Sequence, residues 1–170
     1  ATREAFVEDW FRTGDLGELD EDGFLTITGR KKEMLVTAGG KNVAPAPIED
    51  PLRAHPLVGQ VVVIGDSKPF ISALISLDPD MVMVWAQNNG IEKKLTLAEA
   101  TKHPTIIAEI QKTVDEVNKL FSKAEQVRSF EILDVELTEA SGHLTPSLKI
   151  KRSKVMVDFD LQVERIYASA

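Results

Sequence analysis

Residues 10–49 read WFRTGDLGELDEDGFLTITGRKKEMLVTAGGKNVAPAPIE, and the clearest local signal among them is a β-hairpin. The run Asp-Glu-Asp-Gly at 20–23 is typical of a tight turn between two strands. Apolar residues lie on both sides of it, at Leu16–Leu19 and Phe24–Thr28. The stretch therefore predicts a two-stranded hairpin ahead of everything else in the chain.

The second half of the same stretch predicts a strand, a turn and a helix start. MLVT at 34–37 is a short strand pattern, and the adjacent Gly39 and Gly40 predict a turn because glycine adopts positive φ at little cost. Pro47 suits the first turn of a helix, where its missing N–H is not needed. We expect that helix to cover about residues 47–54 and to end before Pro56.

From residue 56 onward, strand and helix patterns alternate. Three strands are expected within 58–65, 70–77 and 129–137. Helices are expected at 78–90, 96–103, 104–127 and 152–167. The composition changes most at 28–32, where hairpin material gives way to this compact alternation of helices and strands.

Composition excludes several classes of protein. The chain has 170 residues, which fits one domain or one domain with a fragment of another, and its net charge of -7 argues against a nucleic-acid partner. It contains no cysteine, so disulfides, thiolate nucleophiles and cysteine-based zinc sites are excluded. The longest apolar run, at 61–65, is far shorter than the roughly 20 residues of a membrane span. The chain opens without methionine, and we interpret it as an internal piece of a longer polypeptide.

Three groups of residues suggest chemistry. Asp15, after a glycine, could accept two hydrogen bonds from a vicinal diol such as a ribose, although an aspartate there is also an ordinary turn former. Arg30, in a basic turn, could reach a phosphate or a ribose, or could simply be solvated. The late stretch LTPSLKIKRSK, at 144–154, gathers four basic residues in an acidic chain. One of its lysines could stabilise negative charge that develops on a substrate. The alternative without a catalytic role is a solvated loop followed by a helix with a basic first turn.

The order and spacing of these groups are more specific than any one of them. Residues 10–49, followed by TPSLKIKR at 145–152, resemble the C-terminal part of the AMP-forming adenylating enzymes, which include acyl-CoA synthetases, luciferases and adenylation domains of peptide synthetases. RKKE, TAGGKN, APAPIE and the stretch between Asp78 and Pro104 are similar to the long-chain fatty acid–CoA ligases. The resemblance implies an α+β fold, with a central three-stranded sheet flanked by helices and a separate two-stranded hairpin.

The resemblance also implies domains and a pivot. Residues 1–29 would be a remnant of the large N-terminal domain, 30–34 a hinge and 35–170 a mobile C-terminal domain. The hinge residue itself falls on Lys32, about which the smaller domain would rotate. The missing N-terminal domain would be the first partner of this chain, and we expect the chain alone to be inactive.

Site residues carry over position by position. The resemblance implies that Asp15 binds the ribose hydroxyls and that Arg30 contacts the nucleotide. Lys149 falls on the lysine that catalyses adenylation, with Arg152 completing the pattern. Leu148 stands where the usual residue is glycine, so the backbone conformation around Lys149 is left open.

A further loop is implied for the second step of the reaction. Gly39, Gly40 and Lys41 match the loop that would lie near the pantetheine arm of CoA during thioester formation. The full-length enzyme would use fatty acid, ATP with Mg²⁺, and CoA. The magnesium ion would be held mainly by the phosphates of ATP and by no residue of this chain. Cytoplasmic localisation, with peripheral contact to a membrane, fits a user of long-chain acids.

Two alternatives stay open. A fatty acyl-AMP ligase would pass its adenylate to a carrier protein instead of CoA, and a non-catalytic interaction domain would use the amphipathic helix 104–127 more than Lys149. His143, in the loop before Lys149, is a further candidate for contact with a substrate or CoA, whereas His55 and His103 precede prolines at helix ends. The three histidines lack the spacing of a metal site.

Overall fold

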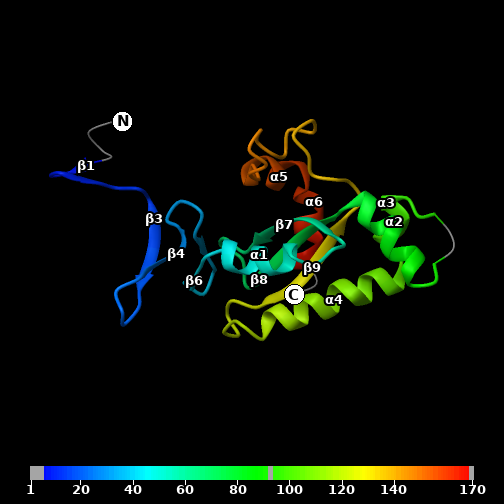
Figure 1. Cartoon of the computed structure of the whole chain (residues 1–170), viewed down its shortest axis with the longest axis horizontal. Helices are drawn as coiled ribbons and strands as arrows, with labels where there is room; N and C mark the ends of the chain where they lie inside the picture. Colours follow the sequence, from blue (N-terminus) through cyan, green and yellow to red (C-terminus); the bar gives the residue numbers. More distant parts are fainter. Residues whose placement is uncertain (1–5, 92–93, 169–170) are drawn as a thin grey trace.

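The computed structural model describes residues 6–91 and 94–168, and its centre is a three-stranded sheet (Figure 1). The strands are β7 (Val58–Ile64), β8 (Ile71–Leu77) and β9 (Val127–Leu133), in the order β7-β8-β9. β7 and β8 are antiparallel neighbours joined by a tight connection, whereas β9 pairs with β8 in parallel after a long helical crossover. The expected α+β fold with a three-stranded sheet and a separate hairpin is confirmed.

Helices cover both faces of this sheet, which explains why β7 reads as a continuous apolar run and why Ser72 and Ser76 of β8, whose sequence alternates, are buried as well. On one face, Val61 and Val63 of β7 join a core made with α1 (Ala46–Arg53) and α4 (Pro104–Asn118). On the other face, Val62 and Ile64 join a second core made with α5 (Arg152–Asp158) and α6 (Asp160–Ala168). All seven residues of β8 are buried. The sheet is thus a rigid support for the loops at its edges.

Three small two-stranded sheets precede this body. They are β1 (Phe6–Val7) with β2 (Trp10–Phe11), β3 (Asp15–Leu19) with β4 (Leu25–Arg30), and β5 (Leu35–Val36) with β6 (Asn42–Val43). The β3–β4 hairpin is the one predicted from its turn, where the Asp20 carboxylate accepts hydrogen bonds from the backbone N–H groups of Asp22 and Phe24. In Figure 1 it stands apart from the body at one end of the molecule.

Two shorter helices lie between β8 and α4. In α2 (Pro79–Asn88) the Asp78 side chain accepts from the N–H groups of Asp80 and Met81, as its predicted capping role requires. α3 (Leu97–Ala100) begins with a capping box formed by Thr96 and Glu99. None of the helices in the described ranges is both long and apolar enough to span a bilayer.

Two helix boundaries differ from the prediction. α4 ends at Asn118 and not near residue 127, because the Asn118 side chain binds both the N–H and the C=O of Val127 and so turns the chain into β9. The expected helix 152–167 is two helices, α5 and α6, which are interrupted at Phe159. Phe159 leaves the helical conformation while its ring is buried in the second core.

Candidate functional site

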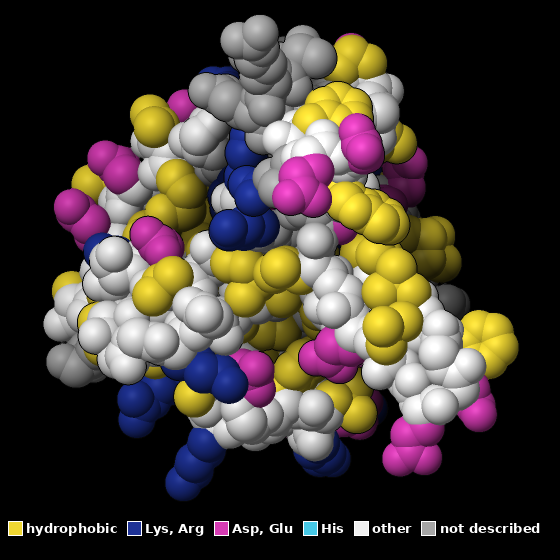
Figure 2. Space-filling model, turned by 90° about the vertical axis from the view of Figure 1, so that its left-hand side faces the viewer, with side chains coloured by type: hydrophobic (Ala, Val, Ile, Leu, Met, Phe, Trp, Pro, Cys, Tyr) yellow, Lys and Arg dark blue, Asp and Glu magenta, His cyan; other side chains and the backbone are white. Residues whose placement is uncertain are grey.

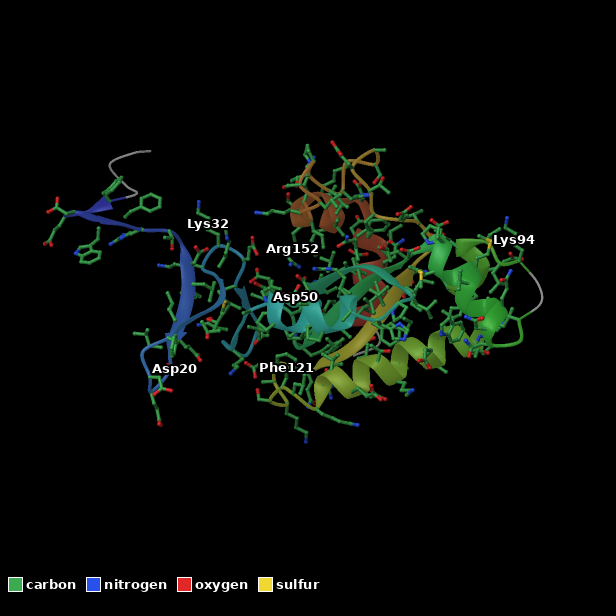
Figure 3. All side chains as sticks on the ribbon, in the orientation of Figure 1. Asp20, Lys32, Asp50, Lys94, Phe121 and Arg152 are labelled. Atoms are coloured by element: carbon green, nitrogen blue, oxygen red, sulfur yellow. The ribbon has the colours of Figure 1, made fainter. Side chains whose placement is uncertain are left out.

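A cleft of about 1410 Å³ separates the β3–β4 hairpin from the body of the chain. Asp15, Arg30, Lys32 and Lys149 all line it, so the structure brings together four of the residues that the sequence singled out. In Figure 3, Lys32 is labelled near the hairpin, and Arg152 is labelled across from it on the body. The cleft is therefore our candidate site, and its walls carry both acidic and basic groups.

Asp15 and Arg30 are held together by strand pairing. They are opposite residues in the β3–β4 register, and Arg30 Nε lies 3.1 Å from Asp15 Oδ1. The N–H of Asp15 donates to the Thr13 hydroxyl, and the N–H of Lys31 donates to the carbonyl of Gly14. A ligand with both hydroxyl and phosphate groups could thus meet a carboxylate and a guanidinium at one place.

Lys149 lies near the tip of a short, self-bonded loop. Its N–H donates to the Thr145 hydroxyl at 3.0 Å, and its carbonyl accepts from the N–H of Thr145 at 2.8 Å. Leu144 and Ile150 form an isolated antiparallel bridge that closes the base of the loop. The Lys149 side chain is exposed, and within the described ranges no residue forms a recorded ion pair or hydrogen bond with its ammonium. A charge presented in this way is available to a ligand.

Leu148 gives the loop its turn, and its conformation answers the question that the sequence left open. Its φ is +59°, in the left-handed region that glycine adopts freely and a β-branched residue strongly disfavours. The side chain is 68% exposed, so packing does not compensate for the strain. Leucine therefore holds a backbone conformation in which glycine would be unstrained.

A pair of substitutions at Leu148 tests this conformation. Leu148→Gly relieves left-handed strain, which stabilises the fold by about 1 kcal/mol, but gives the unfolded chain more freedom, which destabilises it by about the same amount. We therefore expect little change in stability. Leu148→Val adds the clash of a β-branched side chain and should lower stability by about 1–2 kcal/mol. Melting temperatures of the two variants measure the difference. Equal melting temperatures would show that residue 148 is not left-handed.

Arg152 has a structural partner that the sequence analysis missed. Its Nη2 lies 2.7 Å from Glu49 Oε1, and its Nη1 donates to the carbonyl of Val63 at 2.6 Å. Glu49 is only 5% exposed and also accepts from the N–H of Val63 at 2.7 Å. The guanidinium thus fixes the end of the Lys149 loop to α1 and β7. A glutamate among the apolar residues of α1 was the available signal, but its partner lies 103 positions away.

The Gly39–Lys41 loop lies elsewhere, since none of its three residues lines the cleft. Gly40 has φ +77°, as expected for a glycine turn, and its N–H donates to the carbonyl of Thr37 at 2.8 Å. Lys41 Nζ lies 3.4 Å from Glu125 Oε1 beyond α4. The pKa of Glu125 is lowered by its hydrogen bond from the Ser122 hydroxyl and then by the charge of Lys41. The loop is thus tied to a different part of the body from Lys149.

Lys32 lies in the turn between β4 and β5, where the N–H of Glu33 donates to the carbonyl of Arg30 at 3.0 Å. Two of the three histidines have polar partners within the described ranges. His55 contacts Glu109, and His143 is buried against Ser141 and Asp158. Across the described ranges, no group of three or more His, Cys, Asp or Glu residues is placed to hold a metal ion.

This chain is similar to known proteins in both sequence and structure. The family model described as AMP-binding enzyme C-terminal domain matches residues 32–170. This chain belongs to the AMP-binding enzyme C-terminal domain family. It is 54% identical, over 98% of its length, to "Long-chain-fatty-acid--CoA ligase FadD15" of Mycobacterium tuberculosis, and 33% identical over 94% to "Long-chain-fatty-acid--CoA ligase ACSBG1" of Homo sapiens. It spans 28% and 24% of these two relatives.

Solved structures support the same assignment. The adenylation domain of a carboxylate reductase from Mycobacterium chelonae matches 98% of this chain and 24% of its own, with a TM-score of 0.75 and 27% identity. The corresponding domain from Segniliparus rugosus, in complex with AMP and a co-purified carboxylic acid, matches 99% of this chain and 25% of its own, with a TM-score of 0.71 and 26% identity. The resemblance to adenylating enzymes is thus confirmed.

Proposed function

We propose that this domain is the C-terminal part of a long-chain fatty acid–CoA ligase. The full-length protein would join a fatty acid to AMP, releasing pyrophosphate from ATP, and would then transfer the acyl group to CoA, releasing AMP. The observation that carries the proposal is the 54% identity, over nearly the whole chain, to a relative named as such a ligase. The cleft that gathers Asp15, Arg30 and Lys149 is consistent with this chemistry.

Lys149 would act in the first step. The fatty carboxylate attacks the α-phosphorus of ATP, and negative charge builds up on the transferred phosphoryl oxygens and on the leaving pyrophosphate. An ammonium aimed at that charge lowers the barrier. Asp15 would accept hydrogen bonds from the ribose hydroxyls, while Arg30, 3.1 Å from it, would contact the nucleotide.

The glycine loop would act in the second step. The thiol of CoA attacks the acyl carbonyl of the adenylate, the C–S bond forms, and AMP leaves as the C–O bond breaks. Gly39, Gly40 and Lys41 lie outside the cleft that holds Lys149, which supports the proposal that the domain presents the two in different orientations. Rotation about Lys32, within a hinge at 30–34, would exchange them, because a few residues in a turn can absorb the change in φ and ψ. The family match, which begins at residue 32, is consistent with this boundary.

The large N-terminal domain would cover the exposed apolar side chains near the hairpin. Trp10, Phe11, Leu19, Phe24 and Leu25 are all more than half exposed. Figure 2 shows this end of the molecule, where hydrophobic side chains gather at the centre of the face. Large exposed apolar patches mark interaction sites. This chain spans only 28% and 24% of the two relatives, so each of them contains further sequence that could form such a domain.

The test is an assay of the full-length protein with ATP, Mg²⁺ and a long-chain fatty acid. We expect pyrophosphate release that depends on the fatty acid, followed by acyl-CoA formation when CoA is added. The absence of pyrophosphate release would overturn the proposal. Acyl transfer to a carrier protein, with none to CoA, would favour the acyl-AMP ligase, and the isolated chain should release no pyrophosphate.

Gly40→Ala tests the loop separately. Alanine at φ +77° costs about 1–2 kcal/mol, so the loop should shift, and thioester formation from supplied acyl-adenylate should slow by about tenfold. Adenylation should be unchanged within about twofold. Gly90→Ala is the matched control, because Gly90 has φ +75° and open space around it but lies at the end of α2. Equal slowing in both variants would mean that the loop has no special part in the second step.

A further inference from the structure

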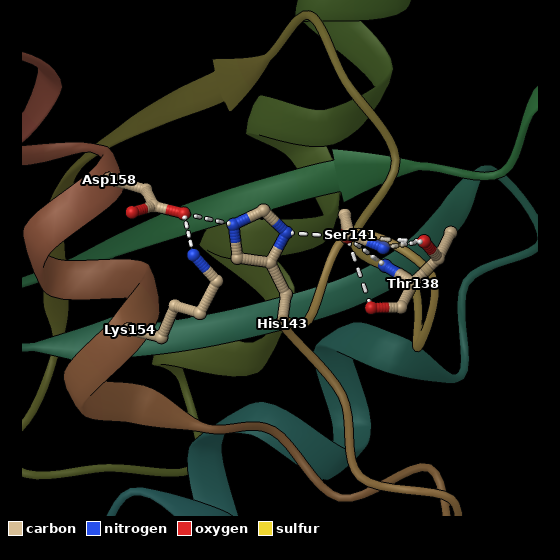
Figure 4. A network of polar contacts seen from close by, with 5 residues as sticks. All are labelled: Thr138, Ser141, His143, Lys154 and Asp158. Carbon is tan, nitrogen blue, oxygen red and sulfur yellow. Dashed lines mark hydrogen bonds and ion pairs between the residues drawn. The ribbon is translucent and has the colours of Figure 1, made fainter.

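Figure 4 shows a continuous chain of polar contacts that joins the side chains of Ser141, His143, Asp158 and Lys154. His143 lies at its centre, with Nδ1 2.7 Å from the Ser141 hydroxyl and Nε2 2.9 Å from Asp158 Oδ2. Lys154 Nζ donates to the same Asp158 oxygen at 2.7 Å. Ser141 is in turn bonded to the N–H and the C=O of Thr138. The chain thus joins the 138–143 segment to α5.

The His143 ring is built into the structure on all sides. It is 6% exposed and lies 5.4 Å, centroid to centroid, from the ring of Phe159 in the second core. The aliphatic part of the Lys154 side chain packs against Gly142. A Cβ atom added at Gly142 would lie only 3.1 Å from Lys154 Cε. Hydrogen bonds from Lys154 and then from His143 lower the pKa of Asp158, so it remains a carboxylate at neutral pH and accepts from Nε2–H. Burial of this kind rules out the contact with substrate that the sequence left open for His143.

The position of His143 in the chain connects this network to Lys149. Its carbonyl accepts from the N–H of Lys151 at 2.8 Å, directly below the bridge between Leu144 and Ile150. The first arm of the Lys149 loop is therefore held to α5 through one imidazole. The second arm is held through Arg152 to Glu49 and Val63. Between these two anchors the base of the loop is held by the buried Leu144 and by Ile150, which packs against the second core, and its tip is held by its own hydrogen bonds.

We propose that His143 is a positioning residue that, by joining Ser141 to Asp158, sets where Lys149 stands in the cleft. This inference rests on the proposed role of Lys149 in adenylation. A misplacement of about 1 Å at a reacting group can lower the rate on the order of 100-fold. A mobile Lys149 loop would therefore lower the rate of adenylation. The second step does not use Lys149 and would be spared.

Ser141, His143 and Asp158 also have the residue types of a nucleophilic triad, but the geometry argues against that function. The Ser141 hydroxyl is engaged in the turn with Thr138, and none of the three residues lines the cleft. The network joins two segments of the fold and does not present a nucleophile to a ligand.

The experiment compares three substitutions of His143 in the full-length protein. His143→Leu keeps apolar bulk against Phe159 but loses both hydrogen bonds, and His143→Ala loses bulk as well. His143→Gln places an amide near the position of Nε2 and can still donate to Asp158. Each variant is assayed for pyrophosphate release, with kcat and KM separated, and for thioester formation from supplied acyl-adenylate.

We expect His143→Leu and His143→Ala to lower kcat for adenylation by about 10- to 100-fold, with KM for the fatty acid and the thioester rate within about twofold. His143→Gln should recover to within about threefold of the parent. If His143→Leu matches the parent, or if both half-reactions fall together in His143→Leu and His143→Gln, the inference is wrong and the histidine only stabilises the fold. If His143→Ala does not fold, the comparison of His143→Leu with His143→Gln still tests the positioning role.

Lys149→Ala, assayed in parallel, distinguishes a failure of this inference from a failure of the proposed role of Lys149 in adenylation. If Lys149→Ala still forms adenylate, the proposed role of Lys149 fails, and the inference fails with it. If Lys149→Ala is inactive in adenylation while His143→Leu is fully active, only the positioning role is lost.

Discussion

Lys149→Ala in the full-length protein should lower the rate of acyl-adenylate formation by about 10²- to 10³-fold, which corresponds to about 3–4 kcal/mol of lost transition-state stabilisation. The ammonium is exposed in a cleft shared with Asp15 and Arg30, and within the described ranges no recorded ion pair neutralises it. The charge is therefore free to meet the phosphoryl group. Pyrophosphate release at saturating ATP and fatty acid measures the effect.

The same variant should form thioester from supplied acyl-adenylate and CoA at nearly the parent rate. Lys151→Ala is the matched control, because Lys151 is exposed, lies two residues away and contributes only its backbone N–H to the loop. We expect it to keep adenylation within about twofold. Lys149→Ala with unchanged pyrophosphate release would contradict adenylation by this lysine. A loss of both half-reactions would instead point to a damaged domain.

The fold was predictable where short-range chemistry decides it. The Asp20–Gly23 turn, the Asp78 cap, the apolar run of β7 and the alternating strand β8 all appear where the sequence places them. The errors lie where distant contacts override local preference. α4 stops at Asn118 because its side chain binds the backbone of Val127, and the last helix breaks at Phe159, whose ring is buried in the second core. Neither event has a signal in helical periodicity.

The residues that line the candidate site were predictable from motifs. The contacts that hold the Lys149 loop in place were not. Asp15, Arg30, Lys32 and Lys149 were found by resemblance, and the structure places them around one cleft. The left-handed conformation of Leu148 was not foreseeable, because a leucine there contradicts ordinary backbone preference.

The two anchors of the loop escaped sequence analysis for a different reason. Glu49 and Arg152 are 103 residues apart, and His143 and Asp158 are 15 residues apart, on different elements. Pairings of this kind are set by the packing of helices on the sheet. The sequence shows which residues carry charge but not which charges meet.

The second large effect is expected for Glu49→Ala, which removes the buried acceptor at the end of the Lys149 loop. The Arg152 guanidinium would lose its ion pair at 2.7 Å, and the N–H of Val63 would lose its acceptor inside the protein. Removing one partner of a fully buried ion pair costs about 3–5 kcal/mol, and we expect a loss near the lower end because the Arg152 side chain is 24% exposed. Urea denaturation of the full-length protein, followed by hydrogen exchange of peptides covering β7, should show this loss in the C-terminal domain.

Two comparisons make the Glu49 prediction specific. Asp50→Ala, one residue along α1, breaks only the surface pair with Arg53 and should cost less than about 1 kcal/mol. The double variant Glu49→Leu with Arg152→Leu removes both charges and should be more stable than Glu49→Ala, because no buried charge is left unpaired. The double variant should nevertheless adenylate slowly, since the loop has lost one of its two anchors. If instead Glu49→Ala exchanges and unfolds like Asp50→Ala, the ion pair does not hold the loop, and Lys149 must be positioned from its other arm alone.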